Sequence, residues 1–269
     1  MTDTDVAAPY RRNGFVAPIR VLDAESARSH RAHLESAEAQ IGAVHYQDKM
    51  HLILTSTWEL ATHPGVLDAV EACIGPNILL YNSMYVIKEP HSPAKVNWHQ
   101  DLTYWGLSDD DAQVTAWLAL SPATAESGCM QMVPGSHLGG RVDHVTPDRR
   151  ADDDVLDLGQ YIEQVDLAAG VHVPLEVGEM SLHHGWTVHS SLPNRSDDRR
   201  IGFNAQYLAP HCRQVMHDGD TAVLVRGVDE FGHFGTEMPA TTDLDPAAIE
   251  RQQAAHRLIK ANYAAVRDR

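Results

Sequence analysis

Two short segments of the chain carry side chains that could bind one metal ion together. The first is His99-Gln100-Asp101, in a run typical of a β-strand. Alternate side chains of a strand project from the same face, so His99 and Asp101 would lie about 7 Å apart. The second segment surrounds His189. Two histidines and one carboxylate form the facial ligand set typical of non-haem iron(II) oxygenases. We therefore predict that His99, Asp101 and His189 bind Fe(II).

An arginine eleven residues after His189 indicates a place for an anion. We predict that a turn over 193–198 joins the strand of His189 to a new strand at Arg200, in a hairpin that holds the guanidinium near the metal. A 2-oxoglutarate cosubstrate binds iron through its keto-acid end, and a planar guanidinium can pair with its distal carboxylate. Ser191 shares the strand face of His189 and can donate to the same carboxylate. Arg199 is the competing residue if the register slips by one.

Several motifs, in matching order and spacing, resemble the phytanoyl-CoA dioxygenase family. They are Trp98-His-Gln-Asp-Leu-Thr-Tyr-Trp105, Ala116-Trp117, Ser127-Gly-Cys-Met130, Val133-Pro-Gly-Ser-His137, Gly178-Glu179 and the segment from His189 to Arg200. The resemblance extends over roughly residues 10–235. It implies a double-stranded β-helix, or jelly roll, with iron bound by His99, Asp101 and His189, 2-oxoglutarate as cosubstrate and O2 as oxidant.

The resemblance also implies which residues hold the cosubstrate. Arg200 and Ser191 would bind its distal carboxylate. Trp117 and Met84 match positions that line the cosubstrate pocket in the family, and Thr115 shares the strand face of Trp117. Plain core packing is the alternative role for Trp117, Thr115 and Met84.

The substrate side of the site is less specified by the motifs. Asn97, on the strand face of His99, Tyr104 and Asn82 are our candidates for substrate contacts. Of the neighbours His183 and His184, one must face the ligand side of its strand, and a structural role is the alternative for either.

A carboxylate at position 101 favours oxygen transfer, because the halogenases of the family carry Ala or Gly there. We expect a hydroxylase that acts on an unactivated C–H bond of a small metabolite or natural-product intermediate and releases succinate and CO2. The alternative is a cupin-like metal protein without oxygenase activity, such as a zinc isomerase or hydrolase or a small-molecule sensor. Arg200 and Ser191 distinguish the two, since a simple zinc site needs neither.

The elements that must position these residues are mainly strands. Seven short runs rich in β-branched and aromatic residues are separated by Pro, Gly, Asn and Asp, and they cover 78–88, 96–101, 113–120, 129–133, 171–176, 180–190 and 200–208. This pattern favours a sandwich or jelly roll. Helices are predicted over 23–41, 63–73 and 245–269. We expect one domain, 1–269, with a β core at about 77–209 and helices packed outside it.

Composition excludes several other classes of protein. The 269 residues carry 21 Lys and Arg against 37 Asp and Glu, a formal charge of −16, without a basic cluster. This balance disfavours nucleic acid or an anionic membrane as partner. Three scattered cysteines support no disulfide framework, and no stretch is apolar enough to span a membrane. With an acidic N-terminus, these features predict a cytoplasmic enzyme with a small-molecule substrate, and the oligomeric state is left open.

Two features of the sequence permit two interpretations each. The segment 210–235 is rich in glycine and aromatic residues, so it is either a lid over the substrate or a plain loop that packs on the barrel. The negative charge either steers a cationic or zwitterionic substrate into the site or serves solubility alone.

Overall fold

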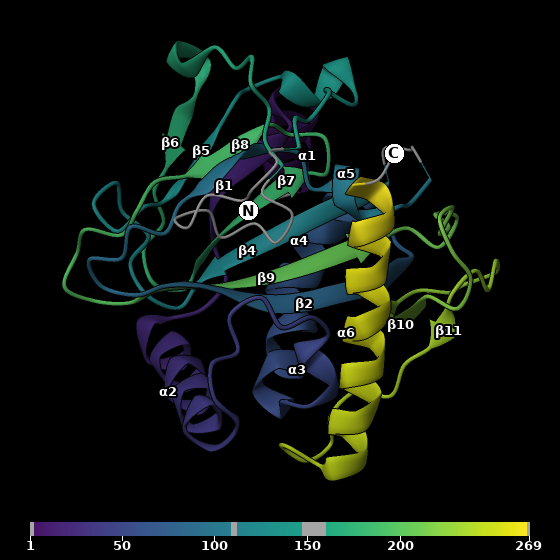
Figure 1. Ribbon diagram of the computed structural model, residues 1–269. Coiled ribbons are helices and arrows are strands. Elements are labelled where there is room, and N and C mark those ends of the chain that lie inside the picture. Colours follow the sequence, from purple (N-terminus) through teal and green to yellow (C-terminus); the bar gives the residue numbers. More distant parts are fainter. Residues whose placement is uncertain (1–2, 109–111, 147–159, 268–269) are drawn as a thin grey trace.

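The computed structural model describes residues 3–108, 112–146 and 160–267, and Figure 1 shows their arrangement. Within these residues the strands form two sheets. The larger sheet has the order β1 (Phe15–Arg20), β7 (Glu179–His184), β4 (Gln113–Ala119), β9 (Arg200–Leu208), β2 (Ile78–Lys88), β10 (Thr221–Arg226) and β11 (Gly235–Thr236). The smaller sheet has the order β3 (Val96–His99), β8 (His189–Ser191), β5 (Met130–Met132) and β6 (Val171–Val173). The predicted jelly-roll class is confirmed.

The two faces of the larger sheet serve different purposes. On one face of β4, Val114, Ala116 and Leu118 pack into the main hydrophobic core, together with residues of the N-terminal helices. The opposite face carries Trp117, which packs against Met130 of the smaller sheet. Alternation along each strand therefore places apolar side chains under the helices and the remaining side chains between the sheets.

Helices cover the outer face of the larger sheet and one end of the barrel (Figure 1). They are α1 (Asp3–Asn13), α2 (Ala24–Ile41), α3 (Thr55–Ala61), α4 (Pro64–Ile74), α5 (Leu102–Trp105) and α6 (Pro246–Arg267), with 3₁₀ turns at Met50–Leu52, Ser136–Gly139 and Leu167–Ala169. The C-terminal helix α6 lies beside α5, because the Asn262 amide donates to the carbonyls of Tyr104 and Trp105. No helix in the described part of the chain is both long and apolar enough to cross a membrane.

The observed strands agree with the sequence pattern at the centre of the fold and differ at its margins. The runs 78–88 and 200–208 are β2 and β9, and they pair along nearly their whole length. The run 180–190 is two strands, β7 and β8, which belong to different sheets. The strands β1, β10 and β11 lie outside the predicted β core of 77–209.

The predicted hairpin between His189 and Arg200 is wrong. β8 belongs to the smaller sheet and β9 to the larger one, so residues 192–199 cross from one sheet to the other. The Asn194 amide holds this crossing by donating to the carbonyls of Lys88 and Asp198. Arg200 therefore faces the metal-binding residues across the interior of the barrel, and not from a neighbouring strand.

Candidate active site

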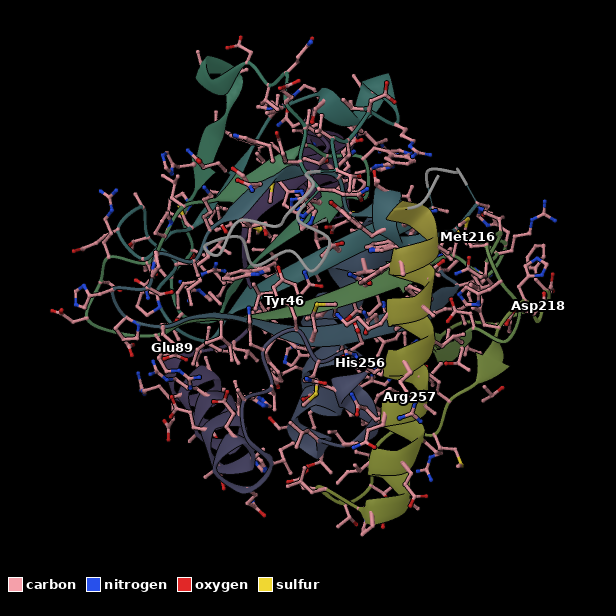
Figure 2. All side chains as sticks on the ribbon, in the orientation of Figure 1. Tyr46, Glu89, Met216, Asp218, His256 and Arg257 are labelled. Atoms are coloured by element: carbon pink, nitrogen blue, oxygen red, sulfur yellow. The ribbon has the colours of Figure 1, made fainter. Side chains whose placement is uncertain are left out.

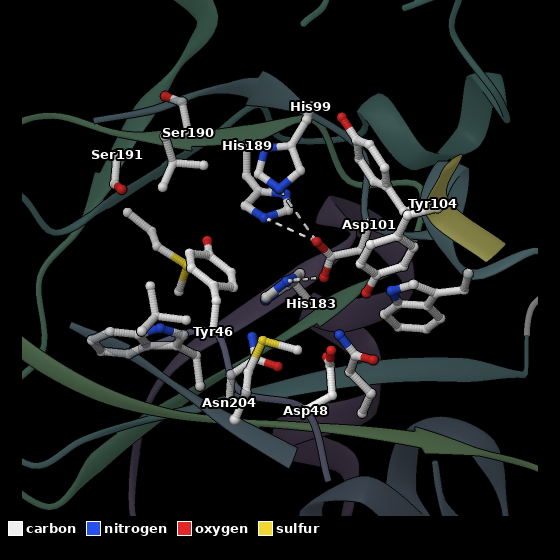
Figure 3. A pocket seen from close by; sticks show the side chains of 18 of the residues that line it. Tyr46, Asp48, His99, Asp101, Tyr104, His183, His189, Ser190, Ser191 and Asn204 are labelled. Atoms are coloured by element: carbon white, nitrogen blue, oxygen red, sulfur yellow. Dashed lines mark hydrogen bonds and ion pairs between the residues drawn. The ribbon is translucent and has the colours of Figure 1, made fainter. Parts of the chain in front are cut away.

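The three predicted metal ligands meet in one place between the sheets. One ligand atom from each of His99, Asp101 and His189 lies within 4.8 Å of the others. The Nε2 atoms of His99 and His189 lie 3.4 Å and 3.5 Å from the same carboxylate oxygen, Oδ1 of Asp101 (Figure 3). Two imidazole nitrogens and one carboxylate oxygen around a common centre are the donors that iron(II) takes in facial triads.

The backbone delivers these ligands from two neighbouring strands. His99 ends β3 and pairs across the sheet with His189, the first residue of β8. The prediction that Asp101 lies on the same strand as His99 is wrong. β3 ends at His99, and Asp101 already has helical backbone angles at the start of α5. The turn into α5 brings the carboxylate back toward the two imidazoles, so the predicted convergence holds for a different reason.

Hydrogen bonds to the backbone orient both imidazoles. Nδ1 of His99 lies 2.9 Å from the carbonyl of Asn97, and Nδ1 of His189 lies 2.9 Å from the carbonyl of Thr187. A carbonyl can only accept, so each Nδ1 carries the proton and each Nε2 presents its lone pair to the centre. Burial, reinforced by the nearby His99, lowers the pKa of His189 to about 3, so this imidazole is neutral at neutral pH.

The carboxylate of Asp101 is held through its second oxygen. Oδ2 accepts a hydrogen bond of 2.9 Å from the Thr115 hydroxyl and lies 3.2 Å from Nε2 of His183. Burial would raise the pKa of Asp101, but the neighbouring histidines outweigh it and hold this pKa well below its ordinary value. Of the pair His183 and His184, it is therefore His183 that faces the site.

A buried cation lies at one end of the same pocket. Arg200 is 1% exposed and packs against the Trp117 ring, with 5.2 Å from its guanidinium carbon to the ring centroid. Its Nε and Nη2 atoms have no hydrogen-bond partner among the described residues. Burial lowers the pKa of Arg200 to about 10, which still leaves the side chain charged at neutral pH. The competing residue, Arg199, points elsewhere and pairs with Glu38 and Glu89.

A second buried base supports this end of the pocket. The Lys88 ammonium donates to the Ser191 hydroxyl at 2.7 Å, and also to the carbonyls of Ser191 and Leu192. Burial, with repulsion from Arg200 added, lowers the pKa of Lys88 to about 6. Lys88 was missed in the sequence, although it shares the strand face of Met84, which was found.

The three ligands and the buried cation line one pocket between the sheets. Its wall includes the three metal-binding side chains, the aromatic residues Trp117, Tyr104, Trp105, Tyr46 and Tyr263, and the polar residues Arg200, Ser191, Asp48, Asn204 and Gln206. A wall of aromatic side chains with a few converging polar groups suits a small organic ligand beside a metal. The predicted residues Met84, Trp117 and Tyr104 all lie on this wall.

Two candidates for substrate contacts lie behind the wall and are not part of it. Asn82 is buried and donates from its amide to Asp48 Oδ1 at 2.8 Å, so it supports a wall residue. Asn97 contributes its carbonyl to His99. Thr115, predicted for the cosubstrate pocket, contacts the Asp101 carboxylate instead.

The C-terminal helix, and not the segment 210–235, closes the substrate side. Among the described residues, the pocket wall takes Lys260 and Tyr263 from α6 and nothing from 210–235. In Figure 2, Asp218 lies at the right-hand edge of the molecule, whereas the pocket residue Tyr46 lies near its centre. The structure therefore favours the plain-loop interpretation of this segment over a lid.

The sequence matches the family described as "Phytanoyl-CoA dioxygenase (PhyH)" over residues 10–202. It is 32% identical over 159 residues to a probable alpha-ketoglutarate-dependent hypophosphite dioxygenase of Stutzerimonas stutzeri, covering 58% of this chain and 55% of that protein. It is 29% identical to the peroxisomal phytanoyl-CoA dioxygenase of Homo sapiens, covering 57% of this chain and 46% of the human protein. The chain thus spans about half the length of these two curated relatives.

Solved structures give a more complete match. The fold is similar to the apo form of a non-heme monooxygenase, ThoJ, with a TM-score of 0.86 and 30% identity, covering 98% of this chain and all of that one. It is also similar to the epimerase SnoN in complex with Fe3+, alpha ketoglutarate and nogalamycin RO, with a TM-score of 0.67 and 25% identity over 90% of this chain and 96% of that one. Because the family profile covers most of the sequence and the predicted iron-binding triad converges, the chain belongs to the phytanoyl-CoA dioxygenase family.

Proposed function

We propose that the whole chain, 1–269, forms a single-domain iron(II)- and 2-oxoglutarate-dependent dioxygenase that hydroxylates an unactivated C–H bond of a small molecule. The observation that carries this proposal is the guanidinium of Arg200. A buried cation without an anionic partner is costly, and Nε and Nη2 of Arg200 have no partner in the described part of the chain, so an anion is needed to complete the site. A zinc isomerase, zinc hydrolase or sensor would have no need of it.

The side chains in the pocket fit both the metal ion and the cosubstrate. His99, Asp101 and His189 would hold Fe(II), and Arg200 with Ser191 would hold the distal carboxylate of 2-oxoglutarate. When bound, the metal and cosubstrate would supply O2 activation, coupled to release of succinate and CO2 and to transfer of one oxygen atom to the substrate.

The protein itself contributes position and a dry environment. Lys88 occupies the acceptor side of the Ser191 hydroxyl, which leaves the hydroxyl proton free to point into the pocket. Trp117 covers the guanidinium of Arg200 on one side, so that water has little access to the ion pair that 2-oxoglutarate would form. Exclusion of water also confines oxidation to the bound substrate.

The comparison proteins support a small-molecule substrate and differ in the reaction. The names of two of them refer to hypophosphite and to nogalamycin RO, and one is an epimerase. We propose hydroxylation because Asp101 supplies the carboxylate of the triad. The mass of the product distinguishes the reactions, since hydroxylation adds one oxygen atom and epimerisation adds none.

The test is anaerobic titration of the metal-free protein with Fe(II) and then 2-oxoglutarate. We expect the visible charge-transfer band of an iron-bound keto acid, followed by succinate formation when O2 and substrate are admitted. In Arg200→Met the 2-oxoglutarate concentration needed for the band should rise at least thirtyfold, since loss of a buried ion pair costs about 2–5 kcal/mol. The matched control is Arg199→Met, which should keep the wild-type requirement because Arg199 pairs with Glu38 and Glu89. Absence of the band in the wild-type protein would refute the proposed function.

A further inference from the structure

Two carboxamide side chains on the pocket wall make no side-chain hydrogen bond to any residue that the structure describes. Asn204 is 9% exposed and Gln206 is 4% exposed, and both line the pocket. Oδ1 of Asn204 and Oε1 of Gln206 are buried without a hydrogen bond to any described residue. Among the described residues, their NH2 groups also make no hydrogen bond, so the observation does not depend on which way each amide is turned.

The position of the two amides sets them apart from the cosubstrate end. Arg200, Asn204 and Gln206 share one face of β9, at four and six residues' separation, so the amides lie about 13 Å and 20 Å along the strand from the arginine. Gln206 pairs across the sheet with Thr115, whose hydroxyl holds the Asp101 carboxylate. Gln206 is therefore level with the Asp101 carboxylate, and Asn204, which pairs with Trp117, lies two residues nearer to Arg200. Both amides border the space beside the metal-binding triad, where a substrate must lie.

The neighbouring carboxylate of Asp48 already has hydrogen-bond partners among the described residues, unlike the two amides. Asp48 lies close to Asn204 on the wall opposite His99 and His189 (Figure 3). Its carboxylate already accepts from the Asn82 amide at 2.8 Å and contacts His256 Nδ1 at 2.8 Å, with the Lys260 ammonium 3.9 Å away. Because this carboxylate has its own cationic and donor partners, the unmet hydrogen-bonding capacity belongs to the two amides.

A carboxamide offers an acceptor and two donors, and an amide edge can satisfy both kinds of group because it offers a donor and an acceptor in return. Leaving two such groups buried and unpartnered is unfavourable, and ligand binding removes that penalty. We infer that Asn204 and Gln206 recognise the substrate, and that the substrate carries an amide or peptide group beside the carbon to be oxidised. This inference rests on the proposed function, and it adds the substrate class. The rings of Tyr104 and Trp105 on the same wall would pack against the apolar part of such a substrate.

The experiment uses the intact protein loaded with Co(II) and 2-oxoglutarate, which does not turn over. The probes are a panel of N-acetyl amino-acid methylamides and the matched panel of O-acetyl hydroxy-acid methyl esters, in which each N–H is replaced by oxygen. Binding is measured by ligand-observed NMR. The variants are Asn204→Leu and Gln206→Met, which keep the side-chain shape, and the control is Gln40→Met, at an exposed glutamine of α2.

We expect methylamides to bind and their ester counterparts to bind on the order of tenfold more weakly. Asn204→Leu and Gln206→Met should weaken methylamide binding by a similar factor and abolish the preference over esters. They should also raise the unfolding temperature of the ligand-free protein by about 2–4 °C, since each removes unpartnered buried polar atoms. A purely structural amide would lower that temperature when replaced. Gln40→Met should change neither quantity.

Three results would overturn the inference. The first is equal binding of amides and esters, and the second is no binding of any methylamide. The third is that the variants raise the 2-oxoglutarate concentration needed for the charge-transfer band and leave probe binding unchanged. The last would assign the amides to the cosubstrate. Failure of the proposed function is a separate result, because it shows as absence of the band in the wild-type protein.

Discussion

At the scale of single residues, the two oxygens of Asp101 have separate tasks. Oδ1 lies between the imidazoles of His99 and His189, whereas Oδ2 is occupied by the Thr115 hydroxyl and by His183. A carboxylate whose second oxygen accepts two hydrogen bonds presents only its first oxygen to a metal. The partners of Oδ2 thereby fix the orientation of the ligand and favour binding through one oxygen.

Replacement of Thr115 by Val tests this division of tasks. Valine keeps the shape of the side chain and removes the hydroxyl that donates to Asp101 Oδ2. We expect the affinity for Fe(II) or Co(II) to fall by about 10- to 100-fold, as is usual when a partner of a metal ligand is lost. Competition with a chelator of known affinity measures the change. Thr115→Ser restores the hydroxyl and should recover most of the affinity. If Val and Ser at this position bind the metal equally well, the hydroxyl has no such role.

The residues that could be found from the sequence are those that strand alternation or a motif placed on one face. His99, His189, Arg200, Trp117 and Met84 follow from these patterns. The same alternation could have identified Asn204 and Gln206 from Arg200, and Lys88 from Met84, because all lie on continuous strands. Tyr46 and Asp48 carry no comparable signal, since they lie in an irregular segment between α2 and the next helical turn.

At the scale of elements, β9 needs a glycine between its cosubstrate end and its substrate end. A Cβ atom at Gly202 would lie 1.9 Å from Cζ2 of Trp117, so the indole occupies the space of the missing side chain. The glycine therefore lets Trp117 lie flat across β9, where it packs on Arg200. A backbone approach this close is a common reason for glycine inside a strand.

Gly202→Ala should therefore displace Trp117 and disturb the arginine with it. We expect a loss of about 1–3 kcal/mol in the free energy of unfolding, the usual cost of overpacking a core, and a higher 2-oxoglutarate requirement in the same variant. Urea unfolding and the anaerobic titration measure the two effects. Gly139→Ala is the control, because a Cβ there has no atom within 4 Å. Wild-type behaviour of Gly202→Ala in both measurements would show that the contact with Trp117 is dispensable.

A buried ionic cluster ties the edge of the larger sheet to the turn that carries Lys49 and His51. Glu237 directly follows the short edge strand β11. Its carboxylate contacts Lys49 at 2.8 Å and His51 at 2.7 Å and accepts from the Thr221 hydroxyl at 2.7 Å. Burial would raise the pKa of Glu237, but Lys49 and His51 outweigh it and lower this pKa from 4.5 to about 2. The cluster therefore stabilises the fold only while Glu237 is ionised.

The sign of the pH dependence follows from that lowered pKa. The stabilisation is complete above pH 4.5 and is lost as the pH falls toward about 2, and it amounts to about 3 kcal/mol at about 1.36 kcal/mol per pH unit. Urea unfolding between pH 6 and the acid limit should show this slope in the wild type and lose it in Glu237→Gln, which should also be less stable at pH 6. The exposed Glu250→Gln should retain the wild-type slope. Parallel curves for wild type and Glu237→Gln would contradict the assignment.

The fold was predictable where elements are long and their pattern is strong. Buried strands such as β2 and β9, with many β-branched and aromatic residues, have the observed boundaries of the predicted runs. The edge strands β1 and β11, and β10 beside β11, were missed, because their pairing partners are set by the tertiary structure. The hairpin between β8 and β9 was wrong for the same reason, since a short connection in the sequence does not show that it changes sheets.

At the scale of the whole molecule, distant parts of the chain build one pocket. Its wall combines residues from the segment before α3, from both sheets and from the C-terminal helix. The chain has a formal charge of −16, which disfavours the approach of a dianion such as 2-oxoglutarate. The buried guanidinium of Arg200, which stays charged at neutral pH, must therefore provide local attraction that exceeds the repulsion of the whole surface.

Because metal and cosubstrate are expected to bind only the folded chain, their binding should appear in its thermal stability. At a 2-oxoglutarate concentration of 100 times the Kd, the stabilisation is about 2.7 kcal/mol, or about 5–10 °C in unfolding temperature for a chain of this size. We expect this shift in Co(II)-loaded wild-type protein and in Arg199→Met, measured by differential scanning fluorimetry. It should vanish in Arg200→Met at the same concentration, and in wild-type protein after removal of the metal by a chelator. A shift that persists without metal would mean that 2-oxoglutarate binds outside the His99, Asp101 and His189 site, because a ligand that requires the iron centre cannot stabilise a protein that lacks it.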